Sequence, residues 1–131
     1  MSTAIDGLAA LRGLRVLVVE DEELIAMLIE DFLLDLGCEV VGPAASVAAA
    51  LALVEAGNLG GALLDMNLNG EPVYAVADGL AARGIPFIFT TGYAREDLVA
   101  RHADAPTLVK PFSSKALQDT IVARFLPRVS G

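Results

Sequence analysis

Basic residues and cysteine are both scarce in this chain, and their scarcity argues against several classes of function. Only 9 of the 131 residues are lysine or arginine, against 17 aspartates and glutamates, which gives a formal net charge of -8. Such a surface would repel the phosphates of a nucleic acid, and no basic stripe compensates, so we expect no nucleic-acid partner. The single cysteine, Cys38, cannot form an internal disulfide, which favours the reducing cytoplasm.

Long apolar runs are also missing from the sequence. No stretch of about 18 apolar residues occurs, so we expect no membrane span, and the N-terminus shows no signal-peptide pattern. Hydrophobic residues are nevertheless abundant, at 55% of the chain, which is enough for one buried core. We interpret residues 1–13 as a loosely patterned leader and residues 14–127 as one domain, with no output domain in the chain.

Five short apolar runs alternate with helical patterns along this domain. The runs predict buried strands at 14–19, 39–42 (closed by Pro43), 62–64, 85–90 and 107–109. Helices are expected at 24–36, from Ser46 to about Gly57, from Val73 to about Arg83, and after Ser113, with a loop at 67–71. Strands that are apolar throughout and alternate with helices indicate a parallel sheet covered on both faces. We therefore predict an α/β, doubly wound, flavodoxin-like fold with five parallel strands in the order 2-1-3-4-5.

Polar residues that could carry chemistry follow or end four of the predicted strands. Glu20 and Asp21 follow the first strand, Asp65 the third, Thr91 the fourth and Lys110 the fifth. Ligands of an open parallel sheet bind outside the carboxyl ends of its strands, so we expect these residues to converge in one crevice. Three clustered carboxylates need a cation, and such oxygen ligands suit Mg²⁺. An aspartate that is already ionised at neutral pH could then attack phosphorus without a general base.

Four short motifs at these strand ends carry a resemblance to a known family. The motifs are Val-Val-Glu20-Asp21-Glu22, Leu-Leu-Asp65-Met66-Asn67, Phe89-Thr90-Thr91-Gly92-Tyr93 and Lys110-Pro111-Phe112. In this order, the motifs resemble those of the receiver domains of response regulators in bacterial two-component systems. The third motif also resembles the Phe-Ala-Thr-Gly signature of an alphaproteobacterial subgroup, whose members are often single domains served by an unusual class of histidine kinases.

The resemblance implies a phosphoacceptor and a metal site. Asp65 would take a phosphoryl group from a histidine kinase, directly or through a phosphotransfer protein, and pass the signal to an unknown downstream protein. Mg²⁺ would be held by Glu20, Asp21, Asp65 and the backbone carbonyl of Asn67. The domain would not be an enzyme beyond catalysing its own phosphorylation and dephosphorylation.

The resemblance also implies a set of switch residues. Thr91 would donate its hydroxyl to the phosphoryl group, and Lys110 would pair with a phosphoryl oxygen. The bond between Lys110 and Pro111 would be cis. The family often has an aromatic residue three positions before the lysine, where this chain has Thr107, so Tyr93 is a candidate for the moving ring.

Two other functions fit parts of the pattern. A magnesium-dependent phosphatase with an aspartyl nucleophile would need a second acid two residues after Asp65, where this chain has Asn67. A degenerate receiver that only binds partners would not need all of the charged residues that this chain retains. Nucleotide hydrolysis is disfavoured, because no Gly-rich loop ending in Gly-Lys-Ser/Thr occurs.

Three features outside the motifs also support expectations. We expect His102, the only histidine, to be a surface residue at a helix end rather than a phosphorelay histidine or a metal ligand. Cys38 is expected to pack as a small apolar residue. The segment 92–105 has the poorest apolar pattern, with only Leu98 and Val99 on an apolar face. We expect its helix to be short or mobile and to face a partner.

Overall fold

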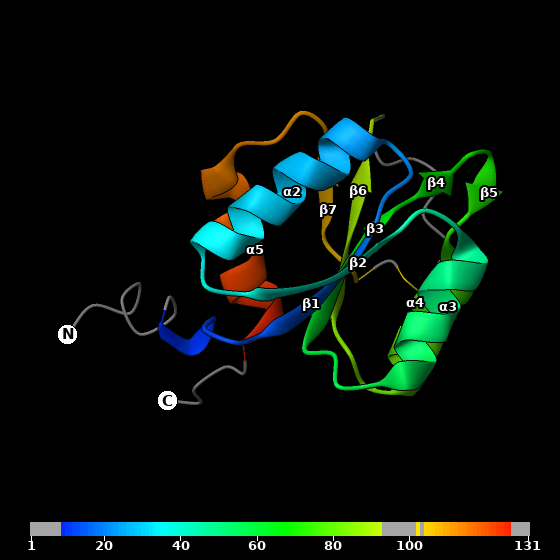
Figure 1. Ribbon diagram of the computed structural model, residues 1–131, viewed down its shortest axis with the longest axis horizontal. Helices are drawn as coiled ribbons and strands as arrows, with labels where there is room; N and C mark the ends of the chain where they lie inside the picture. Colours follow the sequence, from blue (N-terminus) through cyan, green and yellow to red (C-terminus); the bar gives the residue numbers. More distant parts are fainter. Residues whose placement is uncertain (1–8, 93–101, 103, 127–131) are drawn as a thin grey trace.

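A five-stranded parallel sheet lies at the centre of the computed structural model, which describes residues 9–92, 102 and 104–126 (Figure 1). Its strands are β1 (Arg15–Val19), β2 (Glu39–Ala44), β3 (Gly61–Asp65), β6 (Phe87–Thr91) and β7 (Thr107–Val109). They lie side by side in the order β2-β1-β3-β6-β7, and every neighbouring pair is parallel. This arrangement is the predicted 2-1-3-4-5 order, so the doubly wound α/β fold is confirmed.

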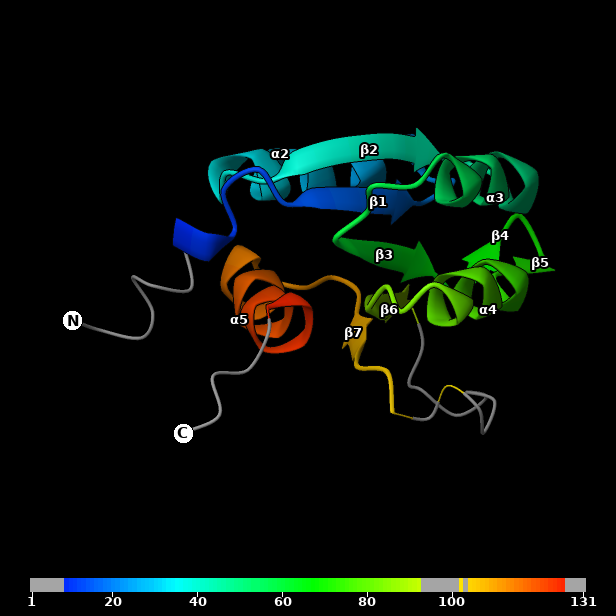
Figure 2. The ribbon, with the colours of Figure 1, turned by 90° about the horizontal axis from the view of Figure 1, so that it is seen from below.

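Helices cover both faces of the sheet (Figure 2). The helices α2 (Glu23–Asp35) and α5 (Ser114–Phe125) pack on one face, and α3 (Val47–Ala56) and α4 (Tyr74–Ala82) pack on the other. Successive strand side chains point to opposite faces, so each strand contributes to both cores. Leu17 and Val19 of β1 belong to the α3–α4 core, whereas Val16 and Val18 belong to the α2–α5 core. Within the described ranges, no helix is long and apolar enough to cross a membrane.

Local sequence signals set the helix boundaries. The side chains of Ser46 and Ser113 cap α3 and α5, because each Oγ accepts a hydrogen bond from the backbone N–H three residues later, at 3.1 and 3.0 Å. The helix α2 gives way to Gly37, whose φ of 87° few other residues adopt. The predicted starts of α3 at Ser46 and of α5 after Ser113, and the predicted end of α2, are therefore confirmed.

Two predictions of local structure are wrong, one for the end of a strand and one for a loop. Pro43 does not close the second strand, because β2 continues to Ala44. As β2 lies at the sheet edge, a proline without an N–H is tolerated there. The predicted loop at 67–71 instead forms an antiparallel hairpin of β4 (Asn67–Leu68) and β5 (Glu71–Pro72). The two-residue turn Asn69-Gly70 is a strong sequence signal for a hairpin, and the prediction of a loop did not take it into account.

The packed domain begins before residue 14. Leu11, which was expected to lie in the leader, is fully buried in the core between the sheet and the helices α2 and α5. The N–H of Gly13 donates to the carbonyl of Gly37 at 2.8 Å and fixes this segment beside the end of α2. The predicted fourth helix lies outside the described residues for most of its length.

Candidate functional site

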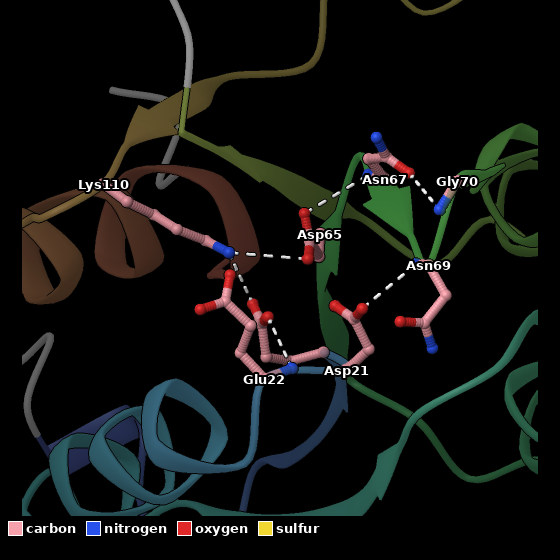
Figure 3. A network of polar contacts seen from close by, with 8 residues as sticks. Asp21, Glu22, Asp65, Asn67, Asn69, Gly70 and Lys110 are labelled. Carbon is pink, nitrogen blue, oxygen red and sulfur yellow. Dashed lines mark hydrogen bonds and ion pairs between the residues drawn. The ribbon is translucent and has the colours of Figure 1, made fainter.

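The predicted site residues converge where the strands end, and Figure 3 shows Asp21, Asp65 and Lys110 pointing toward one another. Glu20 and Asp21 follow β1, Asp65 ends β3, Thr91 ends β6, and Lys110 follows β7. All but Glu20 line one open pocket, together with Glu22, Asn67, Asn69, Gly70 and Gly92. Glu20 is buried and bonds to Lys110, which does line the pocket. The topology therefore brings together residues that the sequence separates by up to 90 positions.

The three carboxylates form a cluster that suits a divalent cation. Glu20, Asp21 and Asp65 each present an oxygen within 4.8 Å of the other two. Glu20 and Asp65 are buried, whereas Asp21 is half-buried and faces the pocket. Hard oxygen donors on one open side of a site are what Mg²⁺ prefers, because this ion keeps several of its waters. The donor set therefore fits the ion that the family resemblance implies.

Lys110 places its ammonium group against this cluster. Its Nζ donates to Glu20 Oε2 at 2.8 Å and lies 3.4 Å from Asp65 Oδ2. Burial lowers the pKa of Lys110, but the hydrogen bond to Glu20 and the charges of Asp65 and Glu20 outweigh it and raise the pKa above its ordinary value. The lysine therefore stays charged. The peptide bond between Lys110 and Pro111 is cis, the conformation that the resemblance implies.

Asp65 holds its proton far more tightly than an ordinary aspartate. Burial, followed by the negative charge of Glu20, raises the pKa of Asp65 to about 7, although the N–H of Asn67 and the charge of Lys110 act in the opposite direction. In the cation-free protein, burial therefore opposes the ionisation of Asp65 that the sequence led us to expect. A divalent cation beside this carboxylate would favour its ionised form.

The β4–β5 hairpin supplies backbone amides to the acidic cluster, and sequence reasoning missed this contribution. The N–H of Asn67 donates to Asp65 Oδ1 at 3.2 Å, and the N–H of Asn69 donates to Asp21 Oδ2 at 3.0 Å. On the other side, the N–H of Glu22 donates to Glu20 Oε1 at 3.1 Å. Each acid of the cluster thus accepts one backbone hydrogen bond. The Asn69-Gly70 pair, which begins four residues after the acid that ends β3, was the available signal.

The predicted switch residues are described in part. Thr91 is buried at the pocket, and its carbonyl accepts a hydrogen bond from the N–H of Lys110 at 2.7 Å. Thr107 lies opposite Phe89 in the β6–β7 ladder, and its buried hydroxyl has no hydrogen-bond partner among the described residues. Tyr93 lies outside those residues, so its proposed role as the moving ring stays a prediction.

The prediction for His102 as a surface residue is wrong. Its side chain is buried, and its Nε2 lies 2.7 Å from Asp78 Oδ1 on α4. The imidazole packs edge-on against Phe87, with ring centroids 5.4 Å apart, and is stacked on Tyr74 at 6.2 Å. A polar ring is tolerated inside this aromatic cluster because Asp78 satisfies one of its nitrogens. Cys38 is buried as expected, and burial raises the pKa of its thiol.

Comparisons with known proteins agree with this geometry. The family model of the response regulator receiver domain matches residues 16–122. The chain is 35% identical over 118 residues to the transcriptional regulatory protein PdtaR of Mycobacterium tuberculosis, in an alignment that covers 85% of the chain and 58% of that relative. The chain thus spans little more than half the length of this curated relative.

Two solved regulators are also similar. SdrG of Sphingomonas melonis Fr1 is 46% identical with a TM-score of 0.77, covering 85% of this chain and 95% of that one. The BeF3-activated conformation of SdrG from Pseudomonas melonis Fr1 is 45% identical to this chain with a TM-score of 0.72. That alignment covers 83% of this chain and 93% of the SdrG chain. The response regulator PhyR of Brucella abortus is 32% identical with a TM-score of 0.79, covering 95% of this chain and 53% of that one.

Proposed function

The chain belongs to the response regulator receiver domain family, and on this premise we propose that Asp65 accepts a phosphoryl group from a histidine kinase, directly or through a phosphotransfer protein. The observation that carries the proposal is the meeting of three carboxylates and one lysine at a single edge of the sheet. A structural salt bridge would need one acid, not three. A divalent cation would balance the surplus negative charge.

The residues around Asp65 divide the work of phosphoryl transfer. Glu20, Asp21, Asp65 and the carbonyl of Asn67 would hold Mg²⁺, which would neutralise charge on the incoming phosphoryl oxygens. One oxygen of Asp65 attacks phosphorus while the bond from phosphorus to the donor nitrogen breaks, and the released imidazole takes a proton from solvent. Lys110 then pairs with a phosphoryl oxygen.

Lys110 must change partners for this to happen. In the free state its ammonium is committed to Glu20 at 2.8 Å, and only the longer 3.4 Å contact reaches Asp65. A phosphoryl group on Asp65 brings new negative charge next to the longer contact, so it competes with Glu20 for the ammonium. Thr91, buried at the end of β6, is the hydroxyl donor that would approach the same group. These two movements would start the conformational signal.

Receiver domains are in general signalling domains rather than enzymes, and we propose the same for this chain. Its chemistry would be limited to its own phosphorylation and dephosphorylation. We place it in the cytoplasm, where histidine kinases present their phosphoryl groups, and expect an unidentified protein as the downstream partner. The acidic surface argues against a nucleic-acid partner.

The test is labelling with acetyl phosphate in the presence and absence of Mg²⁺. Intact mass spectrometry should show the gain of one phosphoryl group that needs Mg²⁺ and disappears in Asp65→Asn. The matched control is Asp31→Asn, which removes an exposed carboxylate from α2 and should leave labelling unchanged. Equal labelling of Asp65→Asn would refute the assignment. Phosphotransfer from each histidine kinase of the source organism would then identify the donor.

A further inference from the structure

The β4–β5 hairpin joins two acids of the site through a chain of hydrogen bonds that begins at Asn67 (Figure 3). The N–H of Asn67 donates to Asp65, and its side-chain Oδ1 accepts from the N–H of Gly70 at 2.7 Å. The N–H of Asn69 donates to Asp21 Oδ2 at 3.0 Å. Asn69 and Gly70 are consecutive. The N–H of Gly70, which donates to the Asn67 side chain, and the N–H of Asn69, which donates to Asp21, therefore belong to adjacent peptide units. Fixing one of them restricts the other.

Within the described residues, few other contacts stabilise the Asn69–Gly70 turn. Asn69 and Gly70 both have a positive φ, of 51° and 85°, which suits a two-residue hairpin turn. The hairpin has only two residue pairs, and Pro72, opposite Asn67, has no N–H to donate. Two-stranded hairpins are at best marginally stable alone. Leu68 anchors β4 in the core, but the turn itself is exposed. The 2.7 Å bond to the Asn67 side chain is therefore a main source of its order.

We propose that the Asn67 side chain is a positioning residue that orders the Asn69–Gly70 turn and so orients Asp21 toward the divalent cation. The inference rests on the proposed function, because it assumes that the acidic cluster binds Mg²⁺. Asp21 is the acid of the three that faces the pocket while only half-buried, so it has the most rotational freedom to lose. An asparagine supplies the acceptor oxygen without adding a fourth carboxylate to the site.

The chain offers a graded set of variants for testing this role. Asn67→Ala removes the acceptor but keeps the backbone carbonyl that would bind the metal. Asn67→Ser restores a neutral acceptor, because Ser46 and Ser113 already accept from the N–H three residues later in this chain. Asn58→Gly is the matched control, since it removes an exposed asparagine side chain at another positive φ, of 61°, outside the pocket.

The first measurement is made without metal, by amide hydrogen exchange and NMR shifts in EDTA. In Asn67→Ala, the amide of residue 69 should lose its protection and its hydrogen-bonded shift, and Asn67→Ser should recover part of both. The Asn58→Gly control should keep the protection of the residue-69 amide. If the residue-69 amide is equally protected in the parent and in Asn67→Ala, the positioning role is wrong, whatever the metal does.

The second measurement is a Mg²⁺ titration followed by amide shifts. Asn67→Ala should weaken Mg²⁺ binding about tenfold, which is the low end of the loss seen when a partner of a metal ligand is removed. Asn67→Ser should recover most of the affinity, and Asn58→Gly should match the parent. An unchanged affinity in Asn67→Ala would overturn the proposal. Absence of Mg²⁺ binding in the parent would instead refute the proposed metal site and the proposal that depends on it. If Asn67→Ala does not fold, Asn67→Ser decides, since it must be intermediate in both measurements.

Discussion

The raised pKa of Asp65 predicts that its carboxylate destabilises the cation-free protein at neutral and alkaline pH. Asp65→Asn keeps the size of the side chain and an oxygen that can accept from the N–H of Asn67, but it cannot ionise. The substitution should therefore stabilise the protein above pH 7 and have much less effect at pH 5. Its benefit comes from removing a buried negative charge that lies beside Glu20.

The size of the effect follows from the difference between the folded and unfolded carboxyl groups. The pKa of Asp65 is about 7 in the folded protein, against about 3.9 in an unfolded chain. The folded state therefore binds more protons between about pH 4 and pH 7, so the favourable contribution is complete below pH 4 and is lost as the pH rises through 7. Each pH unit in that window costs about 1.4 kcal/mol. From pH 5 to pH 8, the advantage of Asp65→Asn over the parent should grow by about 2–3 kcal/mol.

The assay is urea unfolding at pH 5, 6, 7 and 8 in the presence of EDTA, followed by circular dichroism. The free energy of unfolding of Asp65→Asn is compared with that of the parent and of Asp31→Asn, which removes an exposed charge from α2. The Asp31→Asn difference should stay nearly constant with pH. A constant difference for Asp65→Asn would show that its carboxyl titrates normally in the folded state and that the argument from burial is wrong.

Four further predictions concern other parts of the molecule. Mg²⁺ should raise the melting temperature of the parent, because it binds the folded carboxylate cluster, and Asp21→Ala should remove most of that rise in a thermal scan. Lys110→Ala should keep the fold but reduce the spectral change induced by beryllofluoride and Mg²⁺, and an unchanged response would refute its role. Leu11→Ala should lower the free energy of unfolding by about 2–5 kcal/mol in urea, because the side chain is fully buried. Thr107→Val should raise it by about 1 kcal/mol, because the hydroxyl has no partner among the described residues.

The strands of the sheet and the acids of the site could be predicted because each gives a recognisable pattern within a short stretch of the sequence. A strand buried on both faces must be apolar throughout, so β1, β3 and β6 are visible as runs such as Val16–Val19. The carboxyl ends of parallel strands share one edge, so the acids that end these runs could be placed together from the order of the strands alone. The helix caps at Ser46 and Ser113 are local by nature.

The environment of His102 could not be predicted in the same way. Its burial depends on Asp78, which lies 24 residues earlier on α4, and on the aromatic rings of Tyr74 and Phe87. No period or spacing in the sequence connects these residues. A lone histidine among polar neighbours is usually exposed, and only the packing of the segment before β7 against α4 reverses that expectation.

In the free state, the charges that the proposed function requires lower the stability of the domain. Three carboxylates and one ammonium would leave two uncompensated negative charges, and the structure accommodates them in three ways. Lys110 bonds to Glu20, burial raises the pKa of Asp65 and so favours its neutral form, and backbone amides donate to all three acids. A bound cation or phosphoryl group would compete with the Lys110–Glu20 bond and with the proton on Asp65, and the backbone amides would still hold the acids in place. The burial of negative charge that should make Asp65→Asn more stable than the parent is therefore also what would make the crevice receptive to Mg²⁺, and the stability of the domain alone gives no reason to bury these acids together.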